Sequence, residues 1–243
     1  LFSKSALTAD YTATREINSS SYSSGSGDTI QISITTAEDY GVENLSGNSI
    51  STVTNRANIT LTGNNTGNIK GILNNGSITS NLNSNGDIAV TTSGDEDEDS
   101  LSRSAGNVYG IQNRSQIENI ILNGNITSTS SGTGTARGID NSNGGDITLI
   151  RVVNGADISV IGAESSGGSL YGTYNATGIY NHVDTSNSQT IGTIENQVNS
   201  SIVTTRTGIQ INAESGDGTI TTLTNSGTIK TTGITSVTQS GSD

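Results

Sequence analysis

Apolar and polar residues alternate in short runs along most of the chain, and these runs recur in similar form. Each recurrence begins with a glycine followed by an aliphatic residue, and an asparagine usually stands two positions further on. The glycine–aliphatic pairs are Gly41-Val42, Gly71-Ile72, Gly110-Ile111, Gly138-Ile139, Gly178-Ile179, Gly208-Ile209 and Gly233-Ile234. They are spaced between 25 and 40 residues apart. A repeat of this length predicts a solenoid, because each unit has an apolar face that only a neighbouring copy covers.

A second, more regular isoleucine-rich block contains an Asn or Gly turn. The blocks are Ile50–Ile59, Ile78–Ile88, Ile117–Ile126, Ile147–Ile158, Ile191–Ile202 and Ile220–Ile229. Alternation places isoleucine on one face of a strand and polar residues on the other, and Asn and Gly are expected at bends because both tolerate left-handed φ and ψ. Coils of two or three such strands predict an all-β fold, a single-stranded parallel β-helix (β-solenoid) of about six to seven coils with an isoleucine interior. Equivalent asparagines are expected to form ladders of side-chain amides from coil to coil.

The repeat is absent from the N-terminal segment, and its spacing is uneven. Residues 1–40 lack the repeat but contain one alternating run, Thr29–Ile34, so we expect an N-terminal cap with a first strand. Residues 41–243 are expected to form the β-helix as one domain. The longest spacings predict loops inserted near residues 91–104 and 162–176, and loops on a rigid scaffold are where recognition usually resides.

Composition supports an ordered β-fold and narrows the choice of partners. Isoleucine occurs 29 times against 11 leucines, 11 valines and one phenylalanine, which favours strands over helices. Low apolar content and a net charge of −12 would suggest disorder, but a disordered tract has no reason to repeat isoleucine at fixed offsets. Proline and cysteine are absent, so disulfides and thiolate metal sites are excluded. The acidic balance argues against nucleic acid and anionic lipid and leaves neutral glycans or protein.

Residue patterns for catalysis or metal binding are weak. The acidic run Asp95–Asp99 lacks the alternate-residue spacing and the glycine of a calcium loop, so we expect a solvated loop. His182 is the only histidine and is expected at a bend after Asn181. Glu118 and Glu195 come closest to a recurring carboxylate, but their offsets within the block differ. We therefore predict no enzyme activity, no catalytic residues, no metal and no cofactor.

Threonine pairs raise the possibility of an ice-binding face. Such a face requires a flat array of threonines repeated in successive coils. The pairs Thr60/Thr62 and Thr221/Thr224 do not recur along the sequence, so we predict no such array.

Tyrosines gather in the second inserted loop and beside two of the glycine–aliphatic pairs. Tyr171 and Tyr174 follow Leu170 in the loop, whereas Tyr109 and Tyr180 belong to the repeat itself. Tyrosine on a rigid scaffold suits glycan stacking or a protein hot spot. Leu170, Tyr171 and Tyr174 are therefore the candidate partner-binding residues. Tyr109 and Tyr180 are expected either to join them or to pack at coil corners.

The blocks Ile191–Ile202 and Ile220–Ile229, with Gly178-Ile-Tyr-Asn181 and its relatives, resemble the passenger domains of autotransporters, the type V secreted proteins of Gram-negative bacteria. The resemblance covers about residues 41–235. It implies a right-handed β-helix exported across the outer membrane through a C-terminal β-barrel. Such passengers serve most often as adhesins, with toxins and proteases as minorities, and no enzyme motif transfers to this chain. Because neither a signal peptide nor a barrel is recognisable, we expect an internal passenger fragment.

The sequence thus predicts an extracellular, cell-surface passenger that acts as an adhesin or self-association module. The expected partner is a host-cell or matrix protein or glycan, or another copy on a neighbouring bacterium, without direct membrane insertion. Two alternatives stay open: a polysaccharide-degrading β-helix enzyme and a toxin-like passenger.

Overall fold

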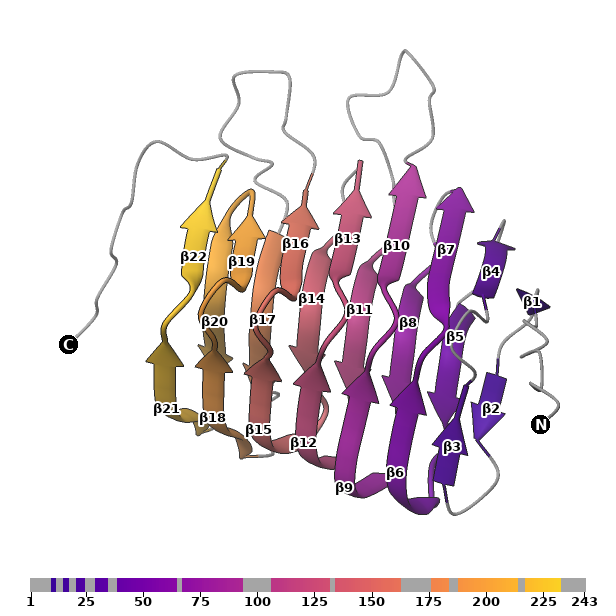
Figure 1. Ribbon diagram of the computed structural model, residues 1–243, viewed down its shortest axis with the longest axis horizontal. Coiled ribbons are helices and arrows are strands. Elements are labelled where there is room, and N and C mark those ends of the chain that lie inside the picture. The colour runs from indigo at the N-terminus through magenta and orange to yellow at the C-terminus, as the bar shows by residue number, and fades with distance from the viewer. Residues whose placement is uncertain are drawn as a thin grey trace, which may run out of the picture.

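The computed structural model describes residues 10–11, 15–17, 21–24, 29–34, 39–64, 67–93, 106–131, 134–162, 176–183, 188–213 and 217–232. Within these ranges every regular element is a β-strand and there is no helix (Figure 1). The strands are β1 (Asp10–Tyr11), β2 (Arg15–Ile17), β3 (Ser21–Ser23), β4 (Thr29–Ile34), β5 (Asp39–Asn44), β6 (Ser49–Asn55), β7 (Asn58–Asn64), β8 (Ile69–Asn74), β9 (Ser77–Ser84), β10 (Ile88–Ser93), β11 (Val108–Asn113), β12 (Gln116–Leu122), β13 (Ile126–Ser130), β14 (Ala136–Asn141), β15 (Asp146–Val152), β16 (Asp157–Ile161), β17 (Ala176–Val183), β18 (Gln189–Asn196), β19 (Ser201–Thr204), β20 (Thr207–Ala213), β21 (Gly218–Asn225) and β22 (Thr228–Thr231).

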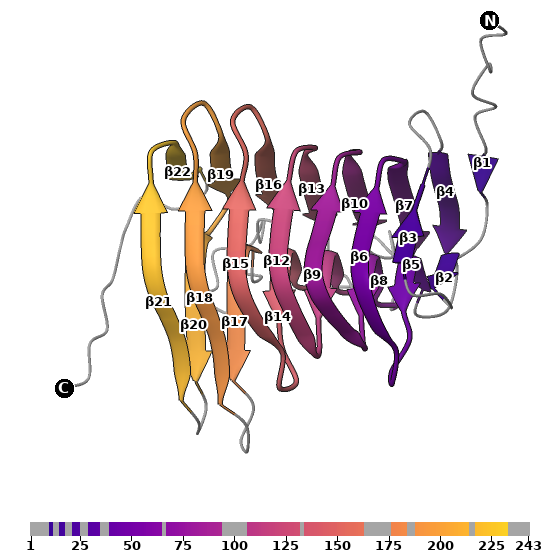
Figure 2. The same cartoon turned by 60° about the horizontal axis from the view of Figure 1, so that its bottom comes forward.

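The strands form three parallel sheets that the chain visits in turn. Sheet A has the order β1-β4-β7-β10-β13-β16-β19-β22, sheet B the order β2-β5-β8-β11-β14-β17-β20, and sheet C the order β3-β6-β9-β12-β15-β18-β21. Each strand therefore pairs with the strands three places before and after it, and one passage through the three sheets is a coil (Figures 1 and 2). The prediction of an all-β fold is confirmed, and the parallel stack is consistent with a β-solenoid.

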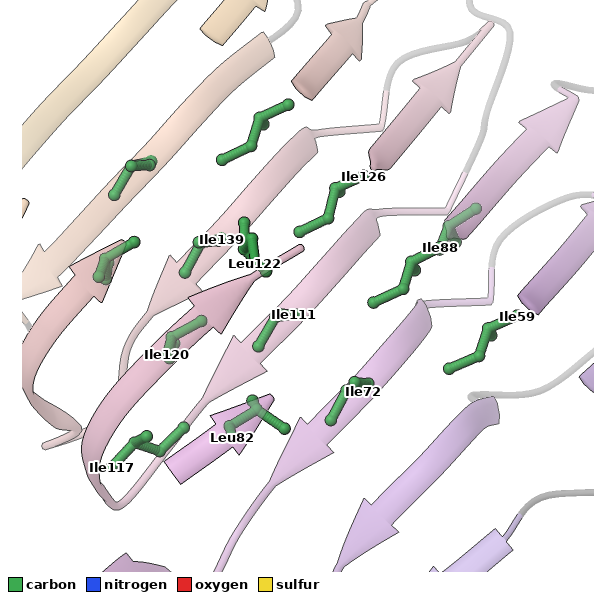
Figure 3. Packing of buried hydrophobic residues seen from close by; sticks show 14 of the residues in the cluster. Ile59, Ile72, Leu82, Ile88, Ile111, Ile117, Ile120, Leu122, Ile126 and Ile139 are labelled. Atoms are coloured by element: carbon green, nitrogen blue, oxygen red, sulfur yellow. The ribbon is translucent and has the colours of Figure 1, made fainter. Parts of the chain in front are cut away.

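Aliphatic side chains stack in columns inside the coils, as the alternation predicts. In sheet A the column is Ile59, Ile88, Ile126, Ile158 and Ile202, each exposed by 1% or less. In sheet B it is Val42, Ile72, Ile111, Ile139 and Ile179, and in sheet C it is Ile50, Ile78, Ile117, Ile147 and Ile191. The columns of the three sheets meet in one continuous core (Figure 3). Burying each such side chain stabilises the fold by about 1.5–3 kcal/mol, so stacking is the main source of stability.

In the six glycine–aliphatic pairs from Gly41 to Gly208, which the structure describes, the glycine lies inside a sheet B strand. A Cβ added at Gly110 would overlap Ile126 Cγ2 and lie only 2.6 Å from the Gly138 carbonyl oxygen. Gly71, Gly138 and Gly178 meet the isoleucine column of sheet A and the glycine of the next coil in the same way. Bends were expected at the glycines of the isoleucine-rich blocks, and Gly86 and Gly124 do lie between strands, whereas the glycines of the pairs lie within strands. Close approach between sheets A and B requires a residue without a side chain.

Asparagine side chains form the predicted amide ladder along the end of sheet B. The Nδ2 atoms of the first four ladder residues each donate to Oδ1 of the asparagine in the next coil, at 2.7, 2.8, 2.9 and 2.8 Å. The ladder residues are Asn44, Asn74, Asn113, Asn141 and Asn181, all exposed by 1% or less. Because each buried amide finds a partner in the next coil, the ladder limits the cost of placing polar groups in the core.

Strands also form within the segment expected to be a cap. β4 spans Thr29–Ile34, the run that the sequence singled out, and pairs with β7. The shorter β1, β2 and β3, which the sequence did not indicate, pair with β4, β5 and β6. Ile17 in β2 is only 2% exposed although β2 is the last strand of its sheet. Ile17 is therefore covered at the N-terminal end of the stack.

Candidate functional site

The candidate partner-binding residues Leu170, Tyr171 and Tyr174 lie outside the described residues, and so does the acidic run Asp95–Asp99. The structure places the strands that flank them. One insertion, residues 94–107, joins β10 to β11, and the other, residues 162–175, joins β16 to β17. Because β10 continues to Ser93, the first insertion begins three residues later than the sequence suggested.

Both insertions leave the stack at the same edge, where sheet A passes to sheet B. By contrast, throughout the stack from β1 to β22, every connection from sheet B to sheet C and from sheet C to sheet A has five residues or fewer. Only β13 lies between β10 and β16 in sheet A. At a strand spacing of about 4.8 Å, the two insertions therefore start about 10 Å apart. We call the edge between sheets A and B, where these connections leave and re-enter the stack, the insertion edge.

A second set of chemically distinctive residues lies on the side of sheet B that faces away from the isoleucine column. The residues before the first five repeat glycines form one line, Tyr40, Lys70, Tyr109, Arg137 and Thr177. A parallel line contains Glu43, Leu73, Gln112, Asp140 and Tyr180. All but Tyr40 and Arg137 are exposed by 8% or less, so this face is largely buried.

On this face, Arg137 contacts residues of both neighbouring strands. Its guanidinium carbon lies 3.6 Å from the centroid of the Tyr180 ring and 5.7 Å from that of Tyr109, which are cation–π distances. The same guanidinium pairs with Asp140, three residues further along β14. Asp140 is completely buried and also accepts hydrogen bonds from Gln112 Nε2 at 2.8 Å and Ser142 Oγ at 2.9 Å. Three hydrogen-bonded partners thus stabilise a carboxylate that would otherwise be costly to bury.

The hydroxyl of Tyr180 is also engaged. It accepts a hydrogen bond from Asn212 Nδ2 at 2.8 Å and lies 3.2 Å from His182 Nδ1. The Tyr180 and His182 rings stack, with centroids 5.6 Å apart and planes inclined by 19°. We name Tyr109, Arg137, Asp140, Tyr180 and His182 the sheet B cluster. Because Tyr109, Asp140 and Tyr180 are buried and the half-buried Arg137 and His182 contact them, the cluster holds adjacent coils together rather than offering an open binding surface.

These positions correct two details of the sequence interpretation. Tyr109 and Tyr180 are packed, but on the face of sheet B and not at coil corners. His182 was expected at a bend and instead lies within β17. The repeat could have indicated this cluster, because residues at the same position before the repeat glycine align from coil to coil.

The carboxylates that were considered for catalysis do not form a pair. Glu118 accepts a hydrogen bond from Thr148 at 3.4 Å, whereas Glu195 pairs with Arg151, with 2.6 Å between Oε2 and Nε. The hydrogen bond that Arg151 donates to Glu195 raises the pKa of Arg151. No group of three His, Asp or Glu residues that could hold a metal ion occurs in the part of the chain that the structure describes. Within the same part, no helix could cross a membrane.

Threonines do align in neighbouring coils, contrary to the sequence expectation. Thr62, Thr91 and Thr129 are register partners on sheet A, and beside them Ala89 lies between Thr60 and Thr127. The uneven insertions hide this alignment in the sequence. The line meets Ile161 in the next coil, so it extends over only three coils among these partners.

Comparison of the chain with protein-family models, with curated proteins and with solved structures gave no match.

Proposed function

We propose that this chain is a passenger segment of a bacterial surface adhesin and that the insertion edge is its binding site. The observation that carries the proposal is the position of the two long insertions, which start about 10 Å apart on one edge of a stiff stack. Loops positioned by a rigid scaffold are the usual place for recognition, and the strands that carry these two insertions are near neighbours in sheet A.

The proposal includes a right-handed coil and export through the outer membrane of a Gram-negative bacterium. Right-handedness is supported by the rule that connections between parallel strands of one sheet are right-handed in about 98% of cases. Export is supported by the resemblance of the repeat to autotransporter passengers. The lack of cysteine and the dependence on coil stacking agree with a chain that becomes stable as it emerges from the outer membrane.

The chemistry of the insertions suits a protein or a neutral glycan of a host cell or matrix, or another copy on a neighbouring bacterium. Tyr171 and Tyr174 supply amphipathic rings for stacking. The acidic run Asp95–Asp99 and the net charge of −12 would repel nucleic acid and anionic lipid surfaces. We therefore propose neither nucleic-acid binding nor membrane insertion.

The test replaces each insertion with the natural connection of the coil that lies between them. Residues 131–135 join β13 to β14 and provide a linker that already fits this edge. Replacing 94–107 or 162–175 with this linker should lower adhesion to host cells or matrix by about tenfold or more, because a recognition surface depends on few residues. Far-UV circular dichroism should stay unchanged.

Point variants sharpen this test. Tyr171→Ala with Tyr174→Ala should reproduce much of the loss, whereas Val198→Ala, an exposed position on a connection from sheet C to sheet A, should have no effect. Unchanged adhesion in both linker variants would refute the insertion edge as the binding site. Release of reducing ends from a glycan panel would instead support the enzyme alternative, and leakage of vesicles would support the toxin alternative.

A further inference from the structure

Asparagine is followed directly by glycine at five places in the chain, and this dipeptide can undergo a chemical change of its own. The glycine amide nitrogen can attack the side-chain carbonyl carbon of the asparagine, because glycine has no side chain to hinder the approach. The five pairs share this chemistry, so differences between them arise from the fold. The pairs are Asn75-Gly76, Asn85-Gly86, Asn123-Gly124, Asn143-Gly144 and Asn154-Gly155.

Two of these pairs are held against the preceding coil through the glycine. Gly86 N donates to the Asn55 carbonyl oxygen at 3.2 Å. Gly124 N donates in the same way to the Ser84 carbonyl oxygen at 3.0 Å. Both glycines are buried, and a Cβ added to either would overlap backbone atoms of the preceding coil. The coil must therefore open locally before either nitrogen can attack.

A third pair, Asn75-Gly76, is restrained at both of its residues. Gly76 is buried, and a Cβ added there would lie only 2.5 Å from the Leu45 carbonyl oxygen. The Asn75 side chain donates from Nδ2 to Glu43 Oε1 at 3.0 Å. Forming a ring here would break this hydrogen bond and displace the backbone of the preceding coil.

The remaining two pairs lie in tight turns on either side of β15, a strand of sheet C (Figure 2). The turn of residues 142–145 closes with a backbone hydrogen bond of 3.1 Å, and φ is 53° at Asn143 and 84° at Gly144, as in a type I′ turn. The turn of residues 153–156 closes with a bond of 2.8 Å, and φ is 88° at Gly155, as in a type II turn. Each turn is thus closed by a single bond between its first and last residues.

The reacting groups of these two turns face solvent. Asn143, Asn154 and Gly155 are exposed, and Gly144 is half-buried. In the part of the chain that the structure describes, neither glycine N–H donates to a protein acceptor. A Cβ added at Gly155 would meet no atom within 4 Å. Attack by the glycine nitrogen therefore requires no loss of packing and no loss of a buried hydrogen bond.

We propose that Asn143 and Asn154 are sites of spontaneous deamidation in the folded chain and that the fold protects the other three pairs. A bond forms between the glycine nitrogen and asparagine Cγ, the bond from Cγ to Nδ2 breaks, and ammonia leaves with the proton of the glycine amide. Water then opens the cyclic imide at either of its two carbonyl carbons. Breaking the new bond gives aspartate, and breaking the original peptide bond gives isoaspartate.

The two products differ in what they do to the turn. Asn154 Oδ1 accepts a hydrogen bond from Asn199 Nδ2 at 3.3 Å, and a carboxylate at the same place still accepts it. Aspartate is therefore compatible with the turn of residues 153–156. Isoaspartate adds a methylene group to the main chain, which changes the turn that leads out of β15. Each reaction also adds one negative charge to a chain whose net charge is −12.

Ageing the whole chain at mildly alkaline pH, followed by proteolysis and mass spectrometry of the peptides, measures the reaction at each pair. We expect Asn143 and Asn154 to react about tenfold or more faster than the protected pairs, because breaking a buried hydrogen bond must precede attack there. The chain unfolded in urea is the matched control, and in it all five pairs should react at similar rates.

Anion exchange of the intact chain gives a second readout, which reactions during proteolysis cannot affect. Acidic forms should accumulate with time. They should decrease in the double variant Asn143→Gln with Asn154→Gln, because the longer side chain forms a ring more slowly. The double variant Asn85→Gln with Asn123→Gln should accumulate them as the unchanged chain does.

Equal rates at all five pairs of the folded chain would overturn the proposal. So would intact Asn143 and Asn154 after the unfolded chain has reacted. Aspartate without isoaspartate would overturn the cyclic route. Both turns lie on connections between sheets B and C or C and A, away from the insertion edge. Deamidation and the proposed function therefore succeed or fail separately.

Discussion

Replacing Asn113 with alanine removes the middle residue of the amide ladder. The Asn113 Nδ2 atom donates to Asn141 Oδ1 at 2.9 Å and to the Ser115 carbonyl oxygen at 2.8 Å, and its Oδ1 accepts from Asn74 Nδ2 at 2.8 Å. In the variant, Asn141 Oδ1 loses its ladder donor, and the Ser115 amide loses its bond to Asn113 Oδ1. Asn74 keeps a second acceptor, the Gln116 carbonyl oxygen at 3.3 Å.

The cost follows from the groups that are left without partners. A buried polar group that loses its hydrogen bond costs about 1–3 kcal/mol, so two such groups predict about 2–6 kcal/mol of lost stability. That is a large share of the roughly 5–15 kcal/mol by which native proteins are stable. Asn123→Ala is the matched control, because Asn123 donates to Asn85 Oδ1 at a similar distance of 2.8 Å but on the exposed surface. Water replaces that bond, so the control should lose less than about 1 kcal/mol.

Urea denaturation, monitored by circular dichroism, measures the difference in the free energy of unfolding between the two variants. Equal denaturant slopes would show that both variants expose the same surface on unfolding. Hydrogen exchange should show lost protection at Ser115 in Asn113→Ala and not in Asn123→Ala. Equal midpoints for the two variants would show that the buried ladder contributes no more than a surface bond, and the reasoning would be refuted.

Three further variants test the packing and the surface charges. Gly110→Ala should destabilise the fold by about 2 kcal/mol or more because its Cβ would overlap Ile126, whereas Gly47→Ala, with φ of 83° and no atom within 4 Å of the added Cβ, should lose only about 1 kcal/mol in the same urea titration. Ile126→Ala should cost about 2–5 kcal/mol and Ile126→Val about 0.5–1.5 kcal/mol; equal thermal midpoints would contradict a close-packed column. Arg151→Ala should change stability by less than about 1 kcal/mol, less still in high salt, because this pair is about one-third exposed. Since the hydrogen bond to Glu195 raises the pKa of Arg151, the pair's contribution is present below the ordinary pKa of arginine and is lost only as the pH rises through the raised pKa of the folded state, so a pH dependence of this stability difference between pH 5 and 8 would contradict the reasoning.

The interior of this protein was predictable from sequence because one local rule generates it. Alternation decides which face of a strand is buried, and the asparagine after each glycine–aliphatic pair gives the position of the ladder. The role of the glycine was not predictable in the same way. Its neighbour Ile126 follows Gly110 by sixteen positions, and only the close approach of sheets A and B explains why no side chain fits there.

Contacts between residues on opposite sides of an insertion could not be predicted from the sequence for a related reason. Arg137 and Tyr180 are 43 positions apart, with one long insertion between them, and only the register of β14 on β17 brings them together. The alignment of Thr91 with Thr129 was obscured by the other insertion. The short strands β1 to β3 could not be predicted because they lack the repeat. The positions of the insertions could be predicted from their length and composition.

Confining the long insertions to one edge lets this chain change its sequence there without disturbing the register of its coils. Closing a flexible loop twice as long costs only about 0.6 kcal/mol more, far less than the loss of a single buried isoleucine. Segments of different lengths are therefore tolerated between β10 and β11 or between β16 and β17, whereas an extra residue within a strand would turn the side chains that follow it to the opposite face. Variation among related chains should therefore accumulate at these two junctions first.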